Sequence, residues 1–357
     1  MTPTPTIGNN TGRIPSLDGW RGLSILLVII GHQIVDGGGN LKSGLIGAIL
    51  SKWFVWHIYG VQIFFVISGF LITYLLLNEY NTYSAISFKN FYIRRFFRII
   101  PAYCFFLLVV FSLSGFFRHE VITAAIWFKA AFFLINFDFG GGCWTLGHIW
   151  SLSVEEQYYL FWPLIFSKTR LRGYIPLMFV CAAPLFRMIN YIRPGWIGDN
   201  SFLVHADAIF WGALFAMFIN SPVLPKFLKY SWLIILMSVV LLVCQKNAVS
   251  HTAYLTVPFA RTFFSMAVII LIYKSLQEGS VLYRIFNNPL LAFVGSISYS
   301  LYLWQQLLYP GSILGESYIT RFPINILLMF LLAFISSRVI EKPFLRFRGR
   351  YLLKTAA

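Results

Sequence analysis

Residues 53–78 read WFVWHIYGVQIFFVISGFLITYLLLN, an apolar run without a single aspartate, glutamate, lysine or arginine. A helix needs about 20 mostly apolar residues to cross the hydrocarbon core of a bilayer, and this run is long enough. The rest of the chain has the same character, because 58% of its residues are hydrophobic and only 11% are charged. Soluble domains have roughly 45–50% apolar and about 25% charged residues. Lipid is therefore the environment that suits this sequence.

Further apolar segments predict an all-α, polytopic membrane protein with about ten transmembrane helices. The segments are residues 17–35, 53–78, 99–117, 149–167, 174–192, 203–220, 231–245, 254–274, 289–309 and 323–341. Segment 122–139 is also apolar, but Lys129 and Asp138 interrupt it, so we interpret it as an interfacial or re-entrant piece. The sequence predicts one transmembrane domain, 16–342, between an N-terminal segment, 1–15, and a basic tail, 343–357.

The positions of the basic residues predict the orientation. Most lysines and arginines of the short loops fall on one side of the alternating spans, including those of segment 89–98 and of the tail. Cytoplasmic loops carry such an excess, so both termini are expected in the cytoplasm. Topology then accounts for the net charge of +16, and nucleic-acid binding is disfavoured because the chain has no soluble basic domain.

Ionisable residues within the predicted spans are candidate functional residues, because a charge at the centre of a bilayer costs about 2.5–3.5 kcal/mol on insertion scales. The candidates are Arg21, His32, Glu155, Glu156, Arg187, Asp207, Arg261 and Arg338. The four cysteines have no metal-type spacing, and no metal site is predicted.

His32 and Glu155 are expected at similar depth in the membrane. His32 lies about 16 Å beyond Arg21 along the first helix, and Glu155 lies about 18 Å from the cytoplasmic end of the fourth. A carboxylate beside a histidine orients it as a general base. We therefore predict that His32 and Glu155 form a catalytic pair inside the membrane.

Arginines near the cytoplasmic end suggest an anion site. Arg95 and Arg98 are i,i+3 neighbours on one helical face, and such a pair suits bidentate contact with phosphates. The alternative is that they only anchor the helix at the cytoplasmic surface. For Arg21, the alternative to anion binding is an ion pair with Asp18 on the same turn. For Asp207, the alternative to a functional role is an ion pair with a nearby arginine.

Several segments together resemble the membrane-bound acyltransferase type 3 family, which includes O-antigen, peptidoglycan and antibiotic O-acyltransferases. They occur in family order and are LDGWRGLSILLVIIGH (17–32), GVQIFFVISGFLI (60–72), FYIRRFFRIIPAY (91–103), HIWSLSVEEQYYLFWP (148–163), DAIFWGALFA (207–216), VGSISYSLYLW (294–304) and EKPF (341–344). The resemblance covers nearly the whole chain.

The resemblance implies a bacterial inner-membrane enzyme that moves an acyl group from cytoplasmic acyl-CoA to a hydroxyl of a sugar or cell-surface glycan. Acyl-CoA, with acetyl-CoA as the default, would be a co-substrate, and no tightly bound cofactor is expected. The residue roles that it implies are catalysis by His32 and Glu155, donor binding by Arg21, Arg95 and Arg98, and support by Ser68, Trp150 and Asp207. From the residues alone, Ser68 is better explained as a small residue that lets helices approach closely.

Two positions depart from the family pattern. Gln305 stands where many members have a histidine, which affects acceptor handling, and His205 stands where many have an arginine, which affects how Asp207 is paired. The acceptor is left open among O-antigen, exopolysaccharide and a small glycosylated metabolite. His32 could act as a base or carry the acyl group itself.

The alternative function is a transporter or flippase of a polar or lipid-linked solute, in which the buried charges form a path. Such proteins often show paired repeats with broken helices, and we find none in this sequence.

Overall fold

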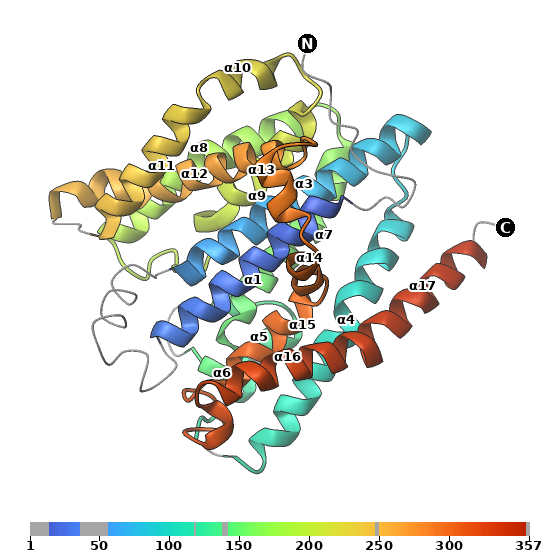
Figure 1. Ribbon diagram of the computed structural model, residues 1–357, viewed down its shortest axis with the longest axis vertical. Coiled ribbons are helices and arrows are strands. Elements are labelled where there is room, and N and C mark those ends of the chain that lie inside the picture. The colour runs from blue at the N-terminus through green and yellow to red at the C-terminus, as the bar shows by residue number, and fades with distance from the viewer. Residues whose placement is uncertain (1–13, 36–55, 118, 138–141, 247–249, 355–357) are drawn as a thin grey trace.

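The computed structural model of the chain describes residues 14–35, 56–117, 119–137, 142–246 and 250–354. Every regular element in these ranges is helical (Figure 1), which confirms the predicted all-α class. The long helices are α1 Pro15–Val35, α3 Trp56–Tyr83, α4 Phe88–Ser114, α7 Ile149–Ser167, α8 Leu171–Ile192, α9 Phe202–Phe218, α11 Ser231–Lys246, α12 Ser250–Ser275 and α16 Ile324–Ser336. The shorter ones are α5 Ala124–Ala131, η1 Ile135–Phe137, α6 Trp144–Gly147, α10 Val223–Lys229, α13 Val281–Phe286, α14 Pro289–Ser296, α15 Ser298–Gln305, η2 Gln306–Leu308, η3 Tyr318–Thr320, η4 Ser337–Glu341 and α17 Lys342–Lys354.

Five of the described helices are long and apolar enough to cross a membrane. They are α3, α4, α8, α12 and the continuous helix formed by α16, η4 and most of α17. A sixth crossing results if α10 and α11, which meet at 55°, form one bent span. The protein is therefore an integral membrane protein with several apolar helices.

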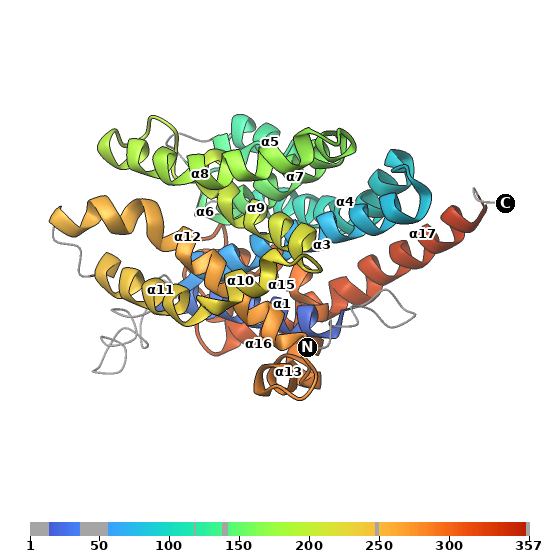
Figure 2. The ribbon, with the colours of Figure 1, turned by 90° about the horizontal axis from the view of Figure 1, so that it is seen from above.

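The central helix is α3. In its most apolar stretch 72% of the residues are buried, against 28% in α4 and 22% in α8, so α4 and α8 lie at the perimeter. Both views place α1 beside α3, and Figure 2 shows α7 and α8 on the far side of α3 and α9 from α1. The C-terminal helix α17 projects from one edge of the molecule.

Glycines bring α3 and α9 into backbone contact. A Cβ atom on Gly69 would collide with the carbonyl group of Ile209, and one on Gly212 would collide with that of Val66. The sequence attributed close helix approach to Ser68, whereas the structure assigns it to the neighbouring Gly69. Ser68 is thus free to point elsewhere.

The predicted ninth span, 289–309, is not one helix, which corrects the prediction. It divides at Ile297 into α14 and α15, and η2 follows directly after α15. Each piece has at most eight residues, about 12 Å at the rise of an α-helix, and none could cross a bilayer of about 30 Å alone. Gly295 lies against the backbone of Asp18 in α1, which holds α14 close to α1. Segment 122–139 contains only the short α5 and η1 among its described residues.

Two contacts show which helix ends lie together. Ser16, at the start of α1, donates a hydrogen bond to the carbonyl oxygen of Ser275 at the end of α12 (2.8 Å). At the other end of α1, Gly31 packs on the backbone of His57 at the start of α3. We call these the Arg21 end and the His32 end of the bundle.

Candidate active site

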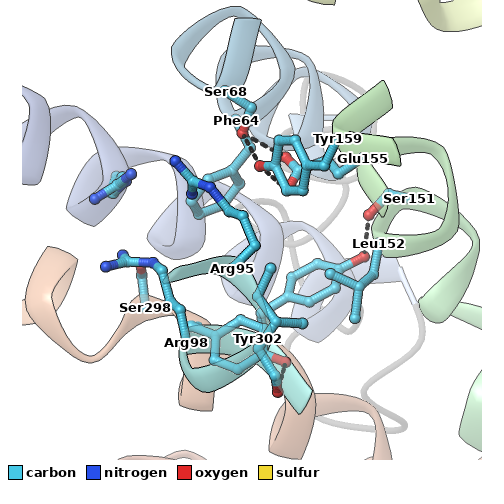
Figure 3. A pocket seen from close by; sticks show the side chains of 13 residues that line it. Phe64, Ser68, Arg95, Arg98, Ser151, Leu152, Glu155, Tyr159, Ser298 and Tyr302 are labelled. Carbon is cyan, nitrogen blue, oxygen red and sulfur yellow. Dashed lines mark hydrogen bonds between the residues drawn. The ribbon is translucent and has the colours of Figure 1, made fainter. Parts of the chain in front are cut away.

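A pocket that contains three arginines lies toward the Arg21 end of the bundle (Figure 3). Helices α1, α3, α4, α7 and α15 all contribute side chains to it. The lining residues are Arg21, Phe64, Ser68, Arg95, Arg98, Ile99, Ser151, Leu152, Glu155, Tyr159, Ser298, Tyr299 and Tyr302. The pocket therefore brings together five of the eight predicted site residues: Arg21, Ser68, Arg95, Arg98 and Glu155.

Glu155 is the carboxylate of this pocket, and two hydroxyl groups hold it. Ser68 donates to Oε1 (2.9 Å), and the hydroxyl of Tyr159 lies 3.0 Å from Oε2 and 3.0 Å from the Ser68 oxygen. The closed triangle of contacts is visible in Figure 3. Hydrogen bonds in which a carboxylate is the acceptor are stronger than bonds between neutral groups, so the three side chains hold one another in place. Ser68 therefore positions Glu155.

The three arginines differ in how their charges are balanced. Arg21 lies 3.6 Å from Asp18, so the predicted alternative of an ion pair holds, and Arg21 lines the pocket as well. Arg95 packs over the ring of Tyr159, with its guanidinium carbon 5.2 Å from the ring centroid. Within the described residues, neither Arg95 nor Arg98 has a carboxylate within salt-bridge distance. The pocket is consequently rich in positive charge.

Arg94 belongs to a different surface. It pairs with Glu79 of α3 at 3.1 Å, and it is absent from the pocket lining. Because Arg94 and Arg95 are consecutive on a helix, they point in directions about 100° apart. Only the i,i+3 pair, Arg95 and Arg98, faces the pocket, as the helical spacing predicts.

His32 lies in an aromatic cluster at the other end of α1. Its ring centroid is 4.7 Å from that of His57, 5.7 Å from Trp144 and 5.9 Å from Tyr309. Trp144 belongs to α6, the turn that precedes α7. His32 is therefore level with the residues before α7.

The structure does not form the predicted contact between His32 and Glu155. The hydrogen bonds to Glu155 come from Ser68 and Tyr159, and His32 is not among the residues that line the arginine pocket. The depth estimate counted residues from the predicted cytoplasmic end of each helix, and it did not include how far α1 and α7 are displaced along their axes. In the structure, Glu155 lies level with Arg21 and Arg95, and His32 lies farther along α1.

Asp207 has a structural environment. Its carboxylate receives both terminal nitrogens of Arg187, at 3.0 and 2.8 Å, and the hydroxyl of Thr262 at 2.6 Å. Arg187 and Asp207 are almost fully buried. These contacts join α8, α9 and α12, and neither residue lines the arginine pocket. The predicted alternative for Asp207, an ion pair with a nearby arginine, is what the structure shows.

Trp150 and His205 form a second contact between α7 and α9. Their ring centroids are 4.6 Å apart, and the ring of Phe65 lies 5.7 Å from that of His205. Nε2 of His205 is 2.9 Å from the carbonyl oxygen of Asp199. The residue that departs from the family pattern thus packs on Trp150, while Arg187 takes the place beside Asp207.

Sequence reasoning missed five polar residues of the pocket: Ser151, Tyr159, Ser298, Tyr299 and Tyr302. Ser151, Glu155 and Tyr159 follow one another at i,i+4 spacing, so they share a helical face, and this spacing was a usable signal. Tyr302 donates to the carbonyl oxygen of His148 (2.6 Å) and lies 2.6 Å from the Ser151 hydroxyl. Ser298 and Tyr302 belong to α15, which begins just after the break at Ile297, and the sequence pattern did not reveal this break.

Gln305 continues the same face of α15 beyond Ser298 and Tyr302. Its side chain is completely buried, and neither its amide nitrogen nor its amide oxygen has a hydrogen-bond partner in the described structure. A buried amide without partners costs roughly 1–3 kcal/mol, so its place on the face next to the pocket is unusual for a packing residue.

Fold and site together define a helical membrane protein with an internal, arginine-rich pocket. The family model described as an acyltransferase domain matches residues 14–341, and the chain belongs to this family. Among curated proteins, the O-acetyltransferase OatA of Staphylococcus aureus strain NCTC 8325 is 29% identical over 92% of the chain. A provisionally named O-acetyltransferase of S. aureus strain COL is 27% identical over 93% of the chain. The chain spans 57% of the length of each relative. No solved structure was found to match it.

Proposed function

We propose that the protein is an integral membrane O-acyltransferase that moves an acyl group, acetyl by default, from cytoplasmic acyl-CoA to a hydroxyl of a sugar or cell-surface glycan. The observation that carries the proposal is the arginine pocket, where Arg95 and Arg98 have no carboxylate partner among the described residues. Family membership supplies the reaction class, and the relatives are named as O-acetyltransferases.

The donor would bind with its phosphates against Arg95 and Arg98. Guanidinium groups bind phosphates with two parallel hydrogen bonds, and here they are not already occupied by a protein carboxylate. Arg21, which shares its charge with Asp18, would complete the anion site. We propose a topology of about ten crossings with both termini in the cytoplasm. In this topology the Arg21 end faces the cytoplasm, where acyl-CoA is present.

The acyl group would then travel along α1 toward His32. The rise from Arg21 to His32 is about 16 Å, comparable with an extended pantetheine arm of roughly 15–20 Å. The thioester would reach His32 while the nucleotide stays on the arginines. There His32 would either deprotonate the acceptor hydroxyl or accept the acyl group and pass it on.

Glu155 would act at the donor end of this path. Its carboxylate orients Ser68 and Tyr159, and it lines the same pocket as Arg21 and Arg95. We propose that it keeps the arginines and the two hydroxyls in place around the arm of the donor. Glu155 is therefore proposed as part of the catalytic machinery, at a distance from His32.

The test uses the purified full chain and labelled acetyl-CoA. His32→Ala is expected to abolish acyl transfer, and the exposed His119→Gln serves as the matched control that keeps it. A single turnover without acceptor should trap an acyl group on His32 if the histidine is acylated. Acyl transfer by His32→Ala, or counter-flow of a labelled solute without any acyl transfer, would remove the proposal.

Two adjacent carboxylates offer a second test. Glu155→Gln should lower the transfer rate by up to about 100-fold, because a misplacement of about 1 Å among groups that position a substrate can cost that much. Glu156→Gln is the control, because Glu156 lines a separate, apolar cavity that contains Phe161 and Phe210. Equal losses in the two variants would count against a specific role for Glu155.

Deletion of the gene, followed by mass spectrometry of the glycans, would identify the acceptor by its lost acetyl group.

A further inference from the structure

A second polar pocket lies at the His32 end, away from the arginine pocket. It has a volume of about 330 Å³ and is formed by the end of α8, the start of α9 with the loop before it, the end of α11 and the first half of α12. Its polar and aromatic lining residues include Arg187, Asn190, Tyr191, Asp199, Gln245 and Arg261. Nothing in the proposed donor chemistry uses them.

Helix α12 places this pocket far from the donor site. Its last residue, Ser275, contacts Ser16 at the Arg21 end. Arg261 precedes Ser275 by about 21 Å of helix at 1.5 Å per residue. On the other wall, Gln245 accepts a hydrogen bond from the hydroxyl of Tyr59 (2.7 Å), near the start of α3.

The two arginines of the pocket are in opposite states. Arg187 uses its guanidinium group fully, on Asp207, Thr262 and the carbonyl oxygens of Val204 and Pro258. Arg261 is partly buried, and the structure gives its guanidinium neither an ion pair nor a hydrogen bond within the described residues. A partly buried cation without a carboxylate partner is costly unless an anion binds to it.

The remaining lining groups suit hydroxyls. Asn190 donates to Oδ1 of Asp199 (2.6 Å), and Asp199, which is exposed, keeps its second carboxylate oxygen available. Gln245 accepts from Tyr59 through its oxygen, which leaves its amide nitrogen as a donor. Tyr191 presents a 42% exposed ring at the rim. Carboxylate, amide and aromatic groups around a concave site are suited to a ring with several hydroxyls.

The pocket and His32 lie against the same turn of α3, on different sides of it. Tyr59, which bonds to Gln245, lies two residues after His57, and the His57 ring is 4.7 Å from that of His32 by centroid. Side chains two residues apart on a helix point away from each other. On the opposite side, Asp199 contacts His205 through its carbonyl oxygen. A ligand held by Arg261 and Gln245 would therefore lie against this turn of α3 on the side that carries Tyr59.

We infer that this pocket binds the acceptor, and that the acceptor is a saccharide with an acidic group. The acidic group pairs with Arg261, and the ring hydroxyls bond to Asp199 and Gln245. This inference rests on the proposed function and adds to it the chemical class of the acceptor and the place where it binds.

The experiment compares two monosaccharides that differ only at one carbon. Binding of D-glucuronate and of D-glucose to the full chain in detergent micelles is measured by saturation-transfer NMR. Glucuronate should bind more tightly to the unaltered protein. Arg261→Gln should weaken glucuronate binding by about tenfold, equivalent to 1.4 kcal/mol, and should leave glucose binding unchanged, whereas Arg261→Lys should retain the preference for glucuronate.

Controls separate charge, folding and function. Arg193→Gln removes a cation that packs on Trp196 just outside the pocket and should leave the preference intact. Acetyl-CoA binding, measured on the same samples, reports an intact fold and tests the donor site independently. Equal binding of the two sugars to the unaltered protein, or an unchanged preference in Arg261→Gln, would overturn the inference. If the unaltered protein still binds acetyl-CoA in that case, the proposed function stands. If the unaltered protein does not bind acetyl-CoA at all, the proposed function is overturned instead.

Discussion

Arg187 and Arg95 are both arginines on apolar helices, yet their surroundings are opposite. Arg187 is 4% exposed, and every terminal nitrogen of its guanidinium contacts an oxygen atom of the protein. Arg95 lines a pocket, packs on the ring of Tyr159, and has no carboxylate partner among the described residues. The first arginine stabilises the contact of three helices, whereas the second leaves positive charge available to a ligand. The state of its partners therefore distinguishes a structural arginine from a binding one.

The largest effect is expected where the charge is fully paired. Asp207→Ala should lower the free energy of unfolding by about 3–5 kcal/mol, because it leaves the buried charge of Arg187 without compensation. Chemical denaturation in detergent measures this change. Asp207→Asn keeps the shape of the side chain and part of its hydrogen bonding, so its free energy of unfolding should lie between those of Asp207→Ala and the unaltered protein. An Asp207→Ala variant as stable as the unaltered protein would show that Arg187 is not held as described.

The opposite pattern is expected in the pocket. Arg95→Gln and Arg98→Gln should each weaken acetyl-CoA binding by roughly 10- to 100-fold, since hydrogen bonds to charged groups are worth about 1.5–3 kcal/mol. Neither substitution removes an ion pair, so the free energy of unfolding should not fall. Isothermal titration calorimetry and thermal unfolding on the same samples measure both quantities. Unaltered donor affinity together with lost stability would assign these arginines to the fold.

The smallest effect is expected at Arg94, the arginine that points away from the pocket. Arg94→Gln breaks the pair with Glu79, and partly exposed pairs contribute about 0.2–1 kcal/mol. Donor affinity should stay within error of the unaltered protein. A loss of affinity as large as that of Arg95→Gln would mean that the general positive charge of this segment, rather than the geometry of the pocket, attracts the donor.

Local chemistry was predictable from the sequence where one helix carries it. The all-helical class follows from composition, and the pocket-facing pair Arg95 and Arg98 follows from helical spacing. An ion pair for Asp207 was one of two alternatives, and its partner Arg187 was not identified because it lies on another helix. The contact between His32 and Glu155 did not follow, because it depends on how far α1 and α7 are displaced along their axes. Such displacements are set by packing between distant segments, here by α6, which places Trp144 rather than Glu155 beside His32.

The broken segment 289–309 had the same kind of cause. Its apolar composition resembles that of a continuous span, but α14 ends at Ser296 and α15 begins at Ser298, and Gly295 lies against the backbone of α1. Ser298 and Tyr302, which line the pocket, belong to α15. Hydropathy records how apolar a segment is, and it holds no information about where neighbouring backbones force a helix to turn.

At Gly69 and Gly212, α3 and α9 touch backbone to backbone, with no side chain between them. Helices in such contact cannot rock apart without opening a gap through the middle of the protein, because packed interiors are hardly compressible. Alternating access depends on rocking of this kind. A rigid contact between α3 and α9 instead favours a mechanism in which only a small group crosses the protein. The molecules that deliver and receive this group then stay on their own sides of the membrane.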